Sequence, residues 1–184
     1  RFVNELANRK VRADAIMVEQ TNGFRAVSIC TKANTKAFED ARPGMLAKLL
    51  EQGIVKEYKS LADIAADYKM PADVLAKTVD DFNKAVKAKN DPEFGRYINN
   101  EQVPLTEGPW YASEMSPKVH HCMGGLVTNL KCQVIDISDG KPVPGLYAAG
   151  EATGGVHGAV RLGSCAILDC LVNGRIAGKE AAKA

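Results

Sequence analysis

Glycine is concentrated in the last third of this 184-residue chain. Five of the 16 glycines lie before residue 120, and the other 11 lie between Gly124 and Gly178. Glycine lets a backbone approach a ligand closely and adopt a positive φ angle. The distribution therefore predicts an ordinary folded segment followed by a ligand-enclosing one, with a boundary near residues 115–117.

Composition and charge exclude several classes of protein. Hydrophobic residues make up 46% and charged residues 25% of the chain, which is typical of a globular protein and not of a disordered or fibrous one. No apolar run reaches the roughly 18 residues that a membrane span needs. The net charge of +2 comes without a cluster of basic residues, so no nucleic-acid partner is predicted.

The cysteines predict neither disulfides nor a c-type haem, and the first residues predict a longer protein. Its five cysteines are irregularly spaced, so they predict no disulfide framework, and no Cys-x-x-Cys-His motif for c-type haem occurs. The chain starts at Arg1 and shows no signal peptide. We therefore expect it to be part of a longer protein.

Two helices are indicated before the boundary. Ser60 and Asp63 have the spacing of a capping box, and Pro71 suits the first turn of a second helix that continues to Lys89. Residues 24–30 alternate in polarity, as a strand does. The apolar positions of the second helix recur at helical spacing: Leu75, Val79, Phe82 and Val86.

The other segments before the boundary are less regular. Residues 36–52 have weak helical character, interrupted at Pro43 and Gly44. Residues 90–109 are polar and contain two prolines, so we expect a long loop.

After the boundary, the pattern predicts short strands and a final helix. Residues 124–129 and 133–137 resemble paired strands, followed by a turn at Asp139. Residues 145–150 are small and apolar, as in a buried strand. Ser164 is a suitable N-cap for a last helix, whose apolar positions are Ile167, Leu168, Leu171, Ile176 and Ala177.

Three glycine-containing segments carry the residues suited to chemistry: residues 120–125, 150–158 and 161–164. A strand, a glycine-rich loop and a helix N-terminus bind anions or electron-rich carbonyls through backbone N–H groups. Glu151 can accept hydrogen bonds from sugar or ribityl hydroxyls, and His120 and Arg161 can hold a carboxylate. Glycine-rich turns with no ligand, and solvated His and Arg side chains, are equally compatible with this spacing.

The histidines and neighbouring cysteines also allow a metal site to be considered. His120, His121 and Cys122 could bind a metal with Cys132 or His157 as a further ligand, but adjacent ligands suit a tetrahedral site poorly, so no metal is predicted. We interpret His157 as a residue that stabilises its loop.

These segments resemble a known family. Residues 120–125, 144–151, 154–158 and 161–165 correspond in order to the motifs His-His-Thr-Met-Gly-Gly, Pro-Gly-Leu-Tyr-Ala-Ala-Gly-Glu, Gly-Gly-Val-His-Gly and Arg-Leu-Gly-Gly-Asn. Those motifs are typical of the flavoprotein subunits of the fumarate reductase and succinate dehydrogenase superfamily, and the likeness is greatest to flavocytochrome c-type soluble fumarate reductases. Residues 1–9 also resemble the family's Arg-Phe-x-Asn-Glu-x-x-x-Arg segment.

The resemblance implies a role for each matching position. Arg9 corresponds to the catalytic arginine that delivers a proton to the substrate, and His120 and Arg161 correspond to the residues that bind a substrate carboxylate. The positions that correspond to FAD contacts are His121 at the flavin N1/O2 edge, Glu151 on the ribityl chain, and Ser164, Ala166 and Ile167 at the helix N-terminus beside the isoalloxazine ring.

Arg9 is an unusual acid, because a free arginine is effectively always protonated. The implied role requires a transient neutral form that is reprotonated through a carboxylate relay. Four positions depart from the family's pattern, so we expect substrate or redox tuning to differ: Lys10 for Asp, Cys122 for Thr, Val160 for Asn and Cys165 for Asn.

The implied fold is an α+β remnant of a capping domain over residues 1–117, followed by the C-terminal half of an FAD-binding α/β domain over residues 118–184. Both are expected to be fragments of a larger flavoprotein. No Gly-x-Gly-x-x-Gly phosphate loop occurs, so most of the site for non-covalent FAD is expected upstream. We therefore expect the chain alone to be inactive.

The implied function is the FAD-dependent reduction of the C=C bond of a small unsaturated carboxylic acid such as fumarate, in anaerobic respiration. A cytochrome c-type haem domain or subunit is the implied electron donor, and the periplasm the implied compartment, with the cytoplasm as the alternative. Alternative functions are a urocanate or methacrylate reductase, a flavin oxidase of the aspartate oxidase type, a ketosteroid dehydrogenase and a flavin-free assembly module. His120 with Arg161 argues against the ketosteroid type.

Overall fold

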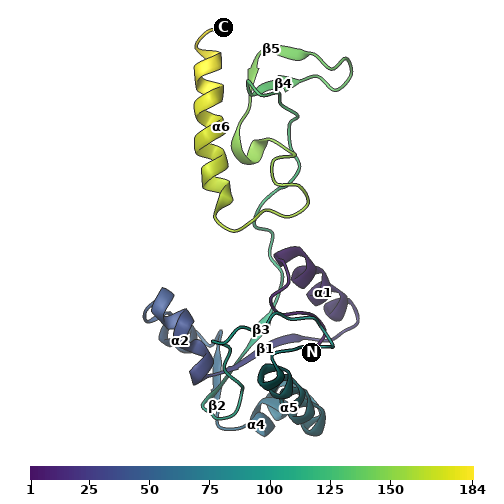
Figure 1. The fold of residues 1–184 in the computed structure, drawn as a ribbon, viewed down its shortest axis with the longest axis vertical. Helices are drawn as coiled ribbons and strands as arrows, with labels where there is room; N and C mark the ends of the chain where they lie inside the picture. The colour runs from purple at the N-terminus through teal and green to yellow at the C-terminus, as the bar shows by residue number, and fades with distance from the viewer. The chain divides into compact units, whose positions relative to one another are not determined.

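The computed structural model describes all residues from 1 to 184 and divides into two compact units, Arg1–Pro117 and Lys118–Ala184. Each unit combines helices and strands, as Figure 1 shows, and each is described by itself. The mixed helix-and-sheet class agrees with the prediction. That the units belong to a capping domain and an FAD-binding domain stays a prediction.

The first unit is built on a three-stranded antiparallel sheet in the order β1-β3-β2. Its strands are β1 (Ala26–Thr31), β2 (Lys56–Tyr58) and β3 (Trp110–Met115). The central strand, β3, therefore comes last in the sequence of this unit. It aligns Ser113 with Ser28 on one side and Tyr111 with Glu57 on the other.

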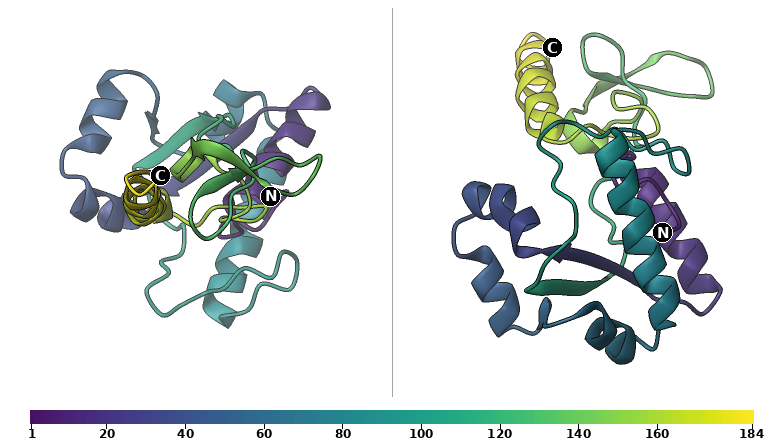
Figure 2. Two further views of the ribbon diagram at one scale, coloured as in Figure 1. Left: turned by 90° about the horizontal axis from the view of Figure 1, so that it is seen from above. Right: turned by 60° about the horizontal axis from the view of Figure 1, so that its bottom comes forward.

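Five helices surround this sheet (Figures 1 and 2): α1 (Arg9–Thr21), α2 (Lys32–Ala41), α3 (Met45–Glu51), α4 (Leu61–Tyr68) and α5 (Ala72–Ala88). The apolar stripe of α5 and the short helix α4 pack against β3. The residues of this core are Ile64, Ala65, Leu75, Val79, Trp110 and Ala112. A second cluster joins the end of α5 to the following loop through Phe82, Ala85, Val86 and Ile98.

Local signals in this unit are confirmed where they are strongest. Ser60 Oγ accepts a hydrogen bond from the backbone N–H of Asp63, and the Asp63 carboxylate accepts one from the N–H of Ser60, which is the predicted capping box. The break between α2 and α3 includes Gly44, whose φ of +76° favours glycine. Pro71 is the N-cap of α5 and so lies one position earlier than predicted.

Three elements of this unit were not predicted. Helix α1 buries no residue completely, and Val11, Met17 and Val18 on it are exposed, so the segment lacks a clear apolar stripe. Strand β2 has three residues, which is too short for an alternating pattern to be recognised. Strand β3 is defined by pairing with residues far away in the sequence.

A buried ion-pair network joins the start of the chain to the loop after α5. Arg1 Nη2 lies 2.6 Å from Asp91 Oδ2, and Arg1 Nε lies 2.6 Å from Glu5 Oε1. Arg96 Nη1 lies 3.1 Å from Glu5 Oε2. The side chain of Asp91 is 2% exposed, so its charge depends on these partners and on the N–H groups of Phe94 and Arg96.

We predict that Asp91→Asn lowers the free energy of unfolding at pH 7 by about 2 kcal/mol. This is below the roughly 3–5 kcal/mol for complete loss of a buried partner, because Asn keeps one acceptor. Hydrogen bonds from Arg1 hold the pKa of Asp91 below its usual range. The stabilisation is therefore present above the unfolded pKa of about 3.9 and is lost as the pH falls through the lower folded pKa.

Urea unfolding between pH 7 and pH 2 tests this prediction. The wild type should lose stability as the pH falls below about 4, and Asp91→Asn should lose less over the same range. The control is Asp14→Asn, the same substitution at an exposed carboxylate on α1 that pairs with Lys10. Equal effects of the two substitutions would contradict a stabilising role for the Arg1–Asp91 pair.

The second unit consists of a hairpin, a short 3-10 turn and one long helix. Strands β4 (Gln133–Ile135) and β5 (Pro142–Tyr147) pair antiparallel, η1 (Gly150–Ala152) follows, and α6 (Cys165–Ala181) ends the chain beside the hairpin (Figure 1). Tyr147 Oη and Cys132 Sγ donate hydrogen bonds to backbone carbonyls of α6. Ser164 is the N-cap of α6, as predicted.

Three predictions for this unit are corrected. Residues 124–129 form no continuous strand. Leu126 bridges to Thr153, and the predicted pairing with residues 133–137 is limited to an antiparallel bridge between Thr128 and Val134. Leu146 is 45% exposed, so the predicted buried strand is an exposed edge of a two-stranded hairpin. The predicted apolar face of α6 is also largely uncovered, since Ile167, Leu168 and Leu171 are exposed and the buried residue of this helix is Asp169.

None of the helices combines the length and the apolar character that a bilayer crossing requires.

Candidate functional site

Two glycines bring the His-pair segment against the glycine-rich loop. Leu126 N–H donates to Ala152 O at 2.9 Å, and Gly154 N–H donates to Leu126 O at 3.1 Å. A Cβ on Gly125 would lie 2.5 Å from Ala152 O, and one on Gly154 would lie 2.8 Å from Gly125 N. Glycine is therefore required at both positions, and this close approach places residues 120–125 beside residues 150–155.

His121 and Glu151 form the centre of this junction. His121 Nδ1 lies 3.1 Å from Glu151 Oε2, and Glu151 Oε1 accepts a hydrogen bond of 2.9 Å from Cys122 N–H. This backbone hydrogen bond, followed by the nearby His121 ring, lowers the pKa of Glu151 below its usual value. The His121 side chain is 4% exposed and that of Glu151 is 52% exposed, so the carboxylate keeps a face open to a ligand.

A second His–carboxylate pair lies next to the first. His157 Nε2 lies 3.1 Å from Asp169 Oδ2, and the rings of His121 and His157 meet edge to face with centroids 5.3 Å apart. Asp169 was not predicted as a site residue. Its only signal in the sequence is a carboxylate within an otherwise apolar run of α6.

Arg161 and His120 differ in exposure. Arg161 is 7% exposed; its Nη1 donates to Leu162 O at 2.8 Å, and its Nε is buried without a partner. A buried, unpartnered guanidinium nitrogen favours an anionic ligand. The His120 side chain is exposed, and the hydrogen bond of Arg161 goes to Leu162 O and not to His120.

The start of α6 offers free backbone donors. Ser164 is in the left-handed region at φ 68°, and its side chain does not cap the helix. Cys165 N–H, at the first position of this 17-residue helix, donates to Leu162 O at 3.4 Å, and the next N–H groups of the first turn lie at its positive end without a side-chain cap. Ala166 lies in this first turn, and Ile167 beside it is 71% exposed.

This set of groups fits the isoalloxazine and ribityl parts of FAD. The uncapped N–H groups suit electron-rich ring carbonyls, the exposed apolar side chain of Ile167 suits a flat aromatic ring, and the open face of Glu151 suits hydroxyl groups. The buried ring of His121 lies beside Glu151 in the same unit.

Arg9 belongs to the first unit and the other predicted site residues belong to the second. It is the first residue of α1, which is capped by Asn8 through a hydrogen bond of 3.0 Å from Val11 N–H. Arg9 is exposed. Lys10, where the family has Asp, is turned along the helix to pair with Asp14.

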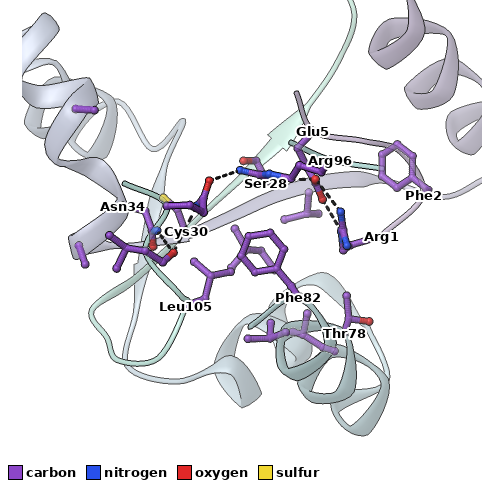
Figure 3. A pocket seen from close by; sticks show the side chains of 18 of the residues that line it. Arg1, Phe2, Glu5, Ser28, Cys30, Asn34, Thr78, Phe82, Arg96 and Leu105 are labelled. Carbon is purple, nitrogen blue, oxygen red and sulfur yellow. Dashed lines mark hydrogen bonds and ion pairs between the residues drawn. The ribbon is translucent and has the colours of Figure 1, made fainter. Parts of the chain in front are cut away.

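The first unit also contains a cavity of about 1,110 Å³ that the sequence did not indicate (Figure 3). Ser28 and Cys30 of β1, Asn34 of α2 and Phe82 of α5 line it, and Arg1, Glu5 and Arg96 carry the charges at one end. None of the predicted site residues lines it. Its volume exceeds the roughly 300–1,000 Å³ of small-molecule pockets.

Two known reductases are similar to this chain over nearly all of its length. An acrylate reductase flavoprotein subunit of Shewanella woodyi is 35% identical over 182 residues, which are 97% of this chain and 35% of that protein. A probable fumarate reductase of Shewanella frigidimarina is 39% identical over 183 residues, which are 100% of this chain and 29% of that protein. The chain thus spans about a third of the length of these relatives.

One solved structure is similar to this chain in both sequence and fold. The open conformation of a flavocytochrome c3 fumarate reductase is 37% identical, with a TM-score of 0.67, over 100% of this chain and 31% of that one. The resemblance to fumarate reductase flavoproteins is thereby confirmed. The sequence model of the family described as FAD binding domain matches residues 1–167, across both units, which confirms FAD as the cofactor. This chain therefore belongs to the FAD binding domain family.

Proposed function

We propose that this chain is part of an FAD-dependent oxidoreductase that reduces the C=C bond of a small unsaturated carboxylic acid. The observation that carries the proposal is the His121–Glu151 pair beside an uncapped helix start, in a chain 35–39% identical to an acrylate and a fumarate reductase. Bound FAD supplies a hydride to one carbon of the double bond. The neighbouring carbon takes a proton, so two electrons and two hydrogens are added.

The residues of the second unit hold the cofactor and the substrate in this proposal. Glu151 binds the ribityl hydroxyls through its open carboxylate face, and the N–H groups at Ser164, Ala166 and Ile167 bind the ring carbonyl edge. His121, held by Glu151, lies at the same edge, where negative charge develops on reduction. These contacts orient the ring and exclude water from one of its faces.

His120 and Arg161 bind the substrate carboxylate. Two cationic or donor groups on a carboxylate withdraw electron density from the conjugated double bond and hold it in place for hydride attack. The unpartnered Nε of Arg161 supports this assignment, because a carboxylate would satisfy a nitrogen that has no partner in the chain.

Arg9 delivers the proton from the first unit. An arginine is a weak acid, so the step requires that a carboxylate relay outside these residues return the proton quickly. Its exposed position at the first turn of α1 supports the role, since the side chain is not engaged by the chain itself. In this proposal residues 1–117 belong to a capping domain that closes over the substrate.

The electron donor and the compartment are further parts of the proposal. The solved relative is a flavocytochrome, which supports a cytochrome c-type haem domain or subunit as the donor. We propose the periplasm as the compartment, with the cytoplasm as the alternative.

Initial rates of the full-length protein with a reduced artificial donor test this function. A panel of fumarate, acrylate, methacrylate and urocanate should contain at least one substrate, and the saturated acids should give no rate. The absence of any rate with a protein that carries FAD would contradict the proposal.

We predict that Arg161→Gln raises KM for the unsaturated acid and lowers kcat/KM by about 10²-fold or more. A charge-assisted hydrogen bond to a carboxylate contributes roughly 1.5–3 kcal/mol, and Arg161 also activates the double bond. Arg175→Gln is the matched control, because Arg175 is an exposed arginine later in α6. Equal kinetics of the two variants would show that Arg161 does not bind the substrate.

A further inference from the structure

A continuous set of contacts in the second unit extends beyond the residues assigned so far. It runs from Glu151 to His121, from His121 to His157, from His157 to Asp169 and from Asp169 to Asn173. The separations are 3.1 Å for His121 Nδ1 to Glu151 Oε2, 5.3 Å between the two ring centroids, 3.1 Å for His157 Nε2 to Asp169 Oδ2, and 2.6 Å for Asn173 Nδ2 to Asp169 Oδ1. Four segments of the unit thus contribute to one cluster.

The cluster is buried at its α6 end. The side chain of Asp169 is 4% exposed and that of His157 is 13% exposed. A carboxylate is rarely buried without donors, and Asp169 has two, since His157 contacts one oxygen and Asn173 donates to the other. The orientation of the Asp169 carboxylate is therefore determined from both sides.

Each carboxylate also determines which nitrogen of its histidine carries a proton. A neutral imidazole donates from one nitrogen and accepts at the other, and a carboxylate can only accept. Asp169 therefore selects the Nε2–H form of His157, and Glu151 selects the Nδ1–H form of His121. That choice leaves Nε2 of His121 unprotonated, so it can only accept a hydrogen bond from a ligand.

We propose that His157 and Asp169 are positioning residues that hold the ring of His121 in one orientation, with its Nδ1–H kept on Glu151. Edge-to-face aromatic pairs have a defined geometry, so a His157 ring that is fixed by Asp169 restricts the rotation of the His121 ring. The consequence for the flavin depends on the proposed function. The coupling between the two histidines does not depend on it.

The test uses the full-length FAD-containing protein with ¹⁵N-labelled histidine. The imidazole ¹⁵N shifts should report the Nδ1–H form for His121 and the Nε2–H form for His157, with His121 assigned by loss of its signals in His121→Gln. In His157→Phe, an aromatic ring remains beside His121, but the hydrogen bond to Asp169 is lost. The freed His121 ring should then rotate away from Glu151. Its minor tautomer should rise about tenfold, which is the effect of losing its own hydrogen bond to that carboxylate.

Asp169→Asn should have the same effect on His121, and Asp139→Asn should have none. Asp139 is an exposed carboxylate between β4 and β5, so it controls for the loss of one negative charge from this unit. If Asp169→Asn does not fold, His157→Phe decides alone.

An unchanged His121 tautomer in folded His157→Phe would overturn the proposal and leave His157 as a residue that only ties its loop to α6. The outcome is separate from that of the proposed function. A protein that reduces no unsaturated acid can still show the coupling between the histidines, and an active reductase can lack it.

Discussion

Replacing Arg9 with Gln should lower kcat for the unsaturated acid by about 10²- to 10⁴-fold, which is the usual contribution of a positioned general acid. The amide keeps hydrogen-bonding capacity but has no proton of suitable acidity to give. Hydride transfer without protonation leaves a carbanion on the substrate, so the barrier rises even when the acid still binds. KM should change little, because in this account His120 and Arg161 hold the carboxylate.

The matched control is Arg12→Gln. Arg12 lies three positions later on α1, is exposed, and makes only a weak contact of 3.4 Å with Glu5 O. It should retain wild-type kcat. Comparable losses in the two variants would mean that α1 needs positive charge in general. A normal kcat in Arg9→Gln would remove Arg9 from the reaction.

Replacing Gly125 with Ala should destabilise the protein by about 3 kcal/mol and release FAD. The new Cβ would lie 2.5 Å from Ala152 O and 2.7 Å from the carbonyl carbon of Thr153, and both are backbone atoms that cannot move aside by rotation. Overpacking against rigid neighbours costs roughly 1–3 kcal/mol, and backbone atoms belong at the upper end. The shift would separate His121 from Glu151, and the FAD contacts proposed for both would be lost.

Gly124→Ala is the control for this prediction. A Cβ at Gly124 meets nothing within 4 Å, although the residue precedes Gly125 directly. Thermal unfolding and the ratio of FAD to protein should be close to wild type in this variant and strongly reduced in Gly125→Ala. Equal behaviour of the two would contradict the requirement for close backbone approach at Gly125.

The parts of the fold that the sequence predicts are those determined by neighbouring residues. The Ser60–Asp63 capping box and the apolar stripe of α5 are local signals, and both are present in the structure. Strand β3 was missed because its two partners lie 50 or more residues before it, at Ala26–Thr31 and Lys56–Tyr58. Small, apolar composition was also a poor guide to burial in β5, whose hairpin leaves Leu146 exposed.

In the candidate site, too, some contacts could be predicted from the sequence and others could not. Motif order and resemblance named His121 and Glu151, and the structure brings them into contact. The pair of His157 with Asp169 could not be predicted. It forms only because the loop that carries His157 folds back onto α6, where Asp169 lies twelve residues further along the chain. Periodicity describes the faces of a helix, but it does not indicate which loop side chain will meet a given position.

Anaerobic reoxidation of the reduced full-length protein is the most direct test of the central claim. The flavin absorbance should return on addition of an unsaturated carboxylic acid such as fumarate or acrylate, one equivalent of the saturated acid should form, and a saturated analogue should cause no change. A flavin that stays reduced with every unsaturated acid and is reoxidised rapidly by oxygen would identify an oxidase and contradict the account.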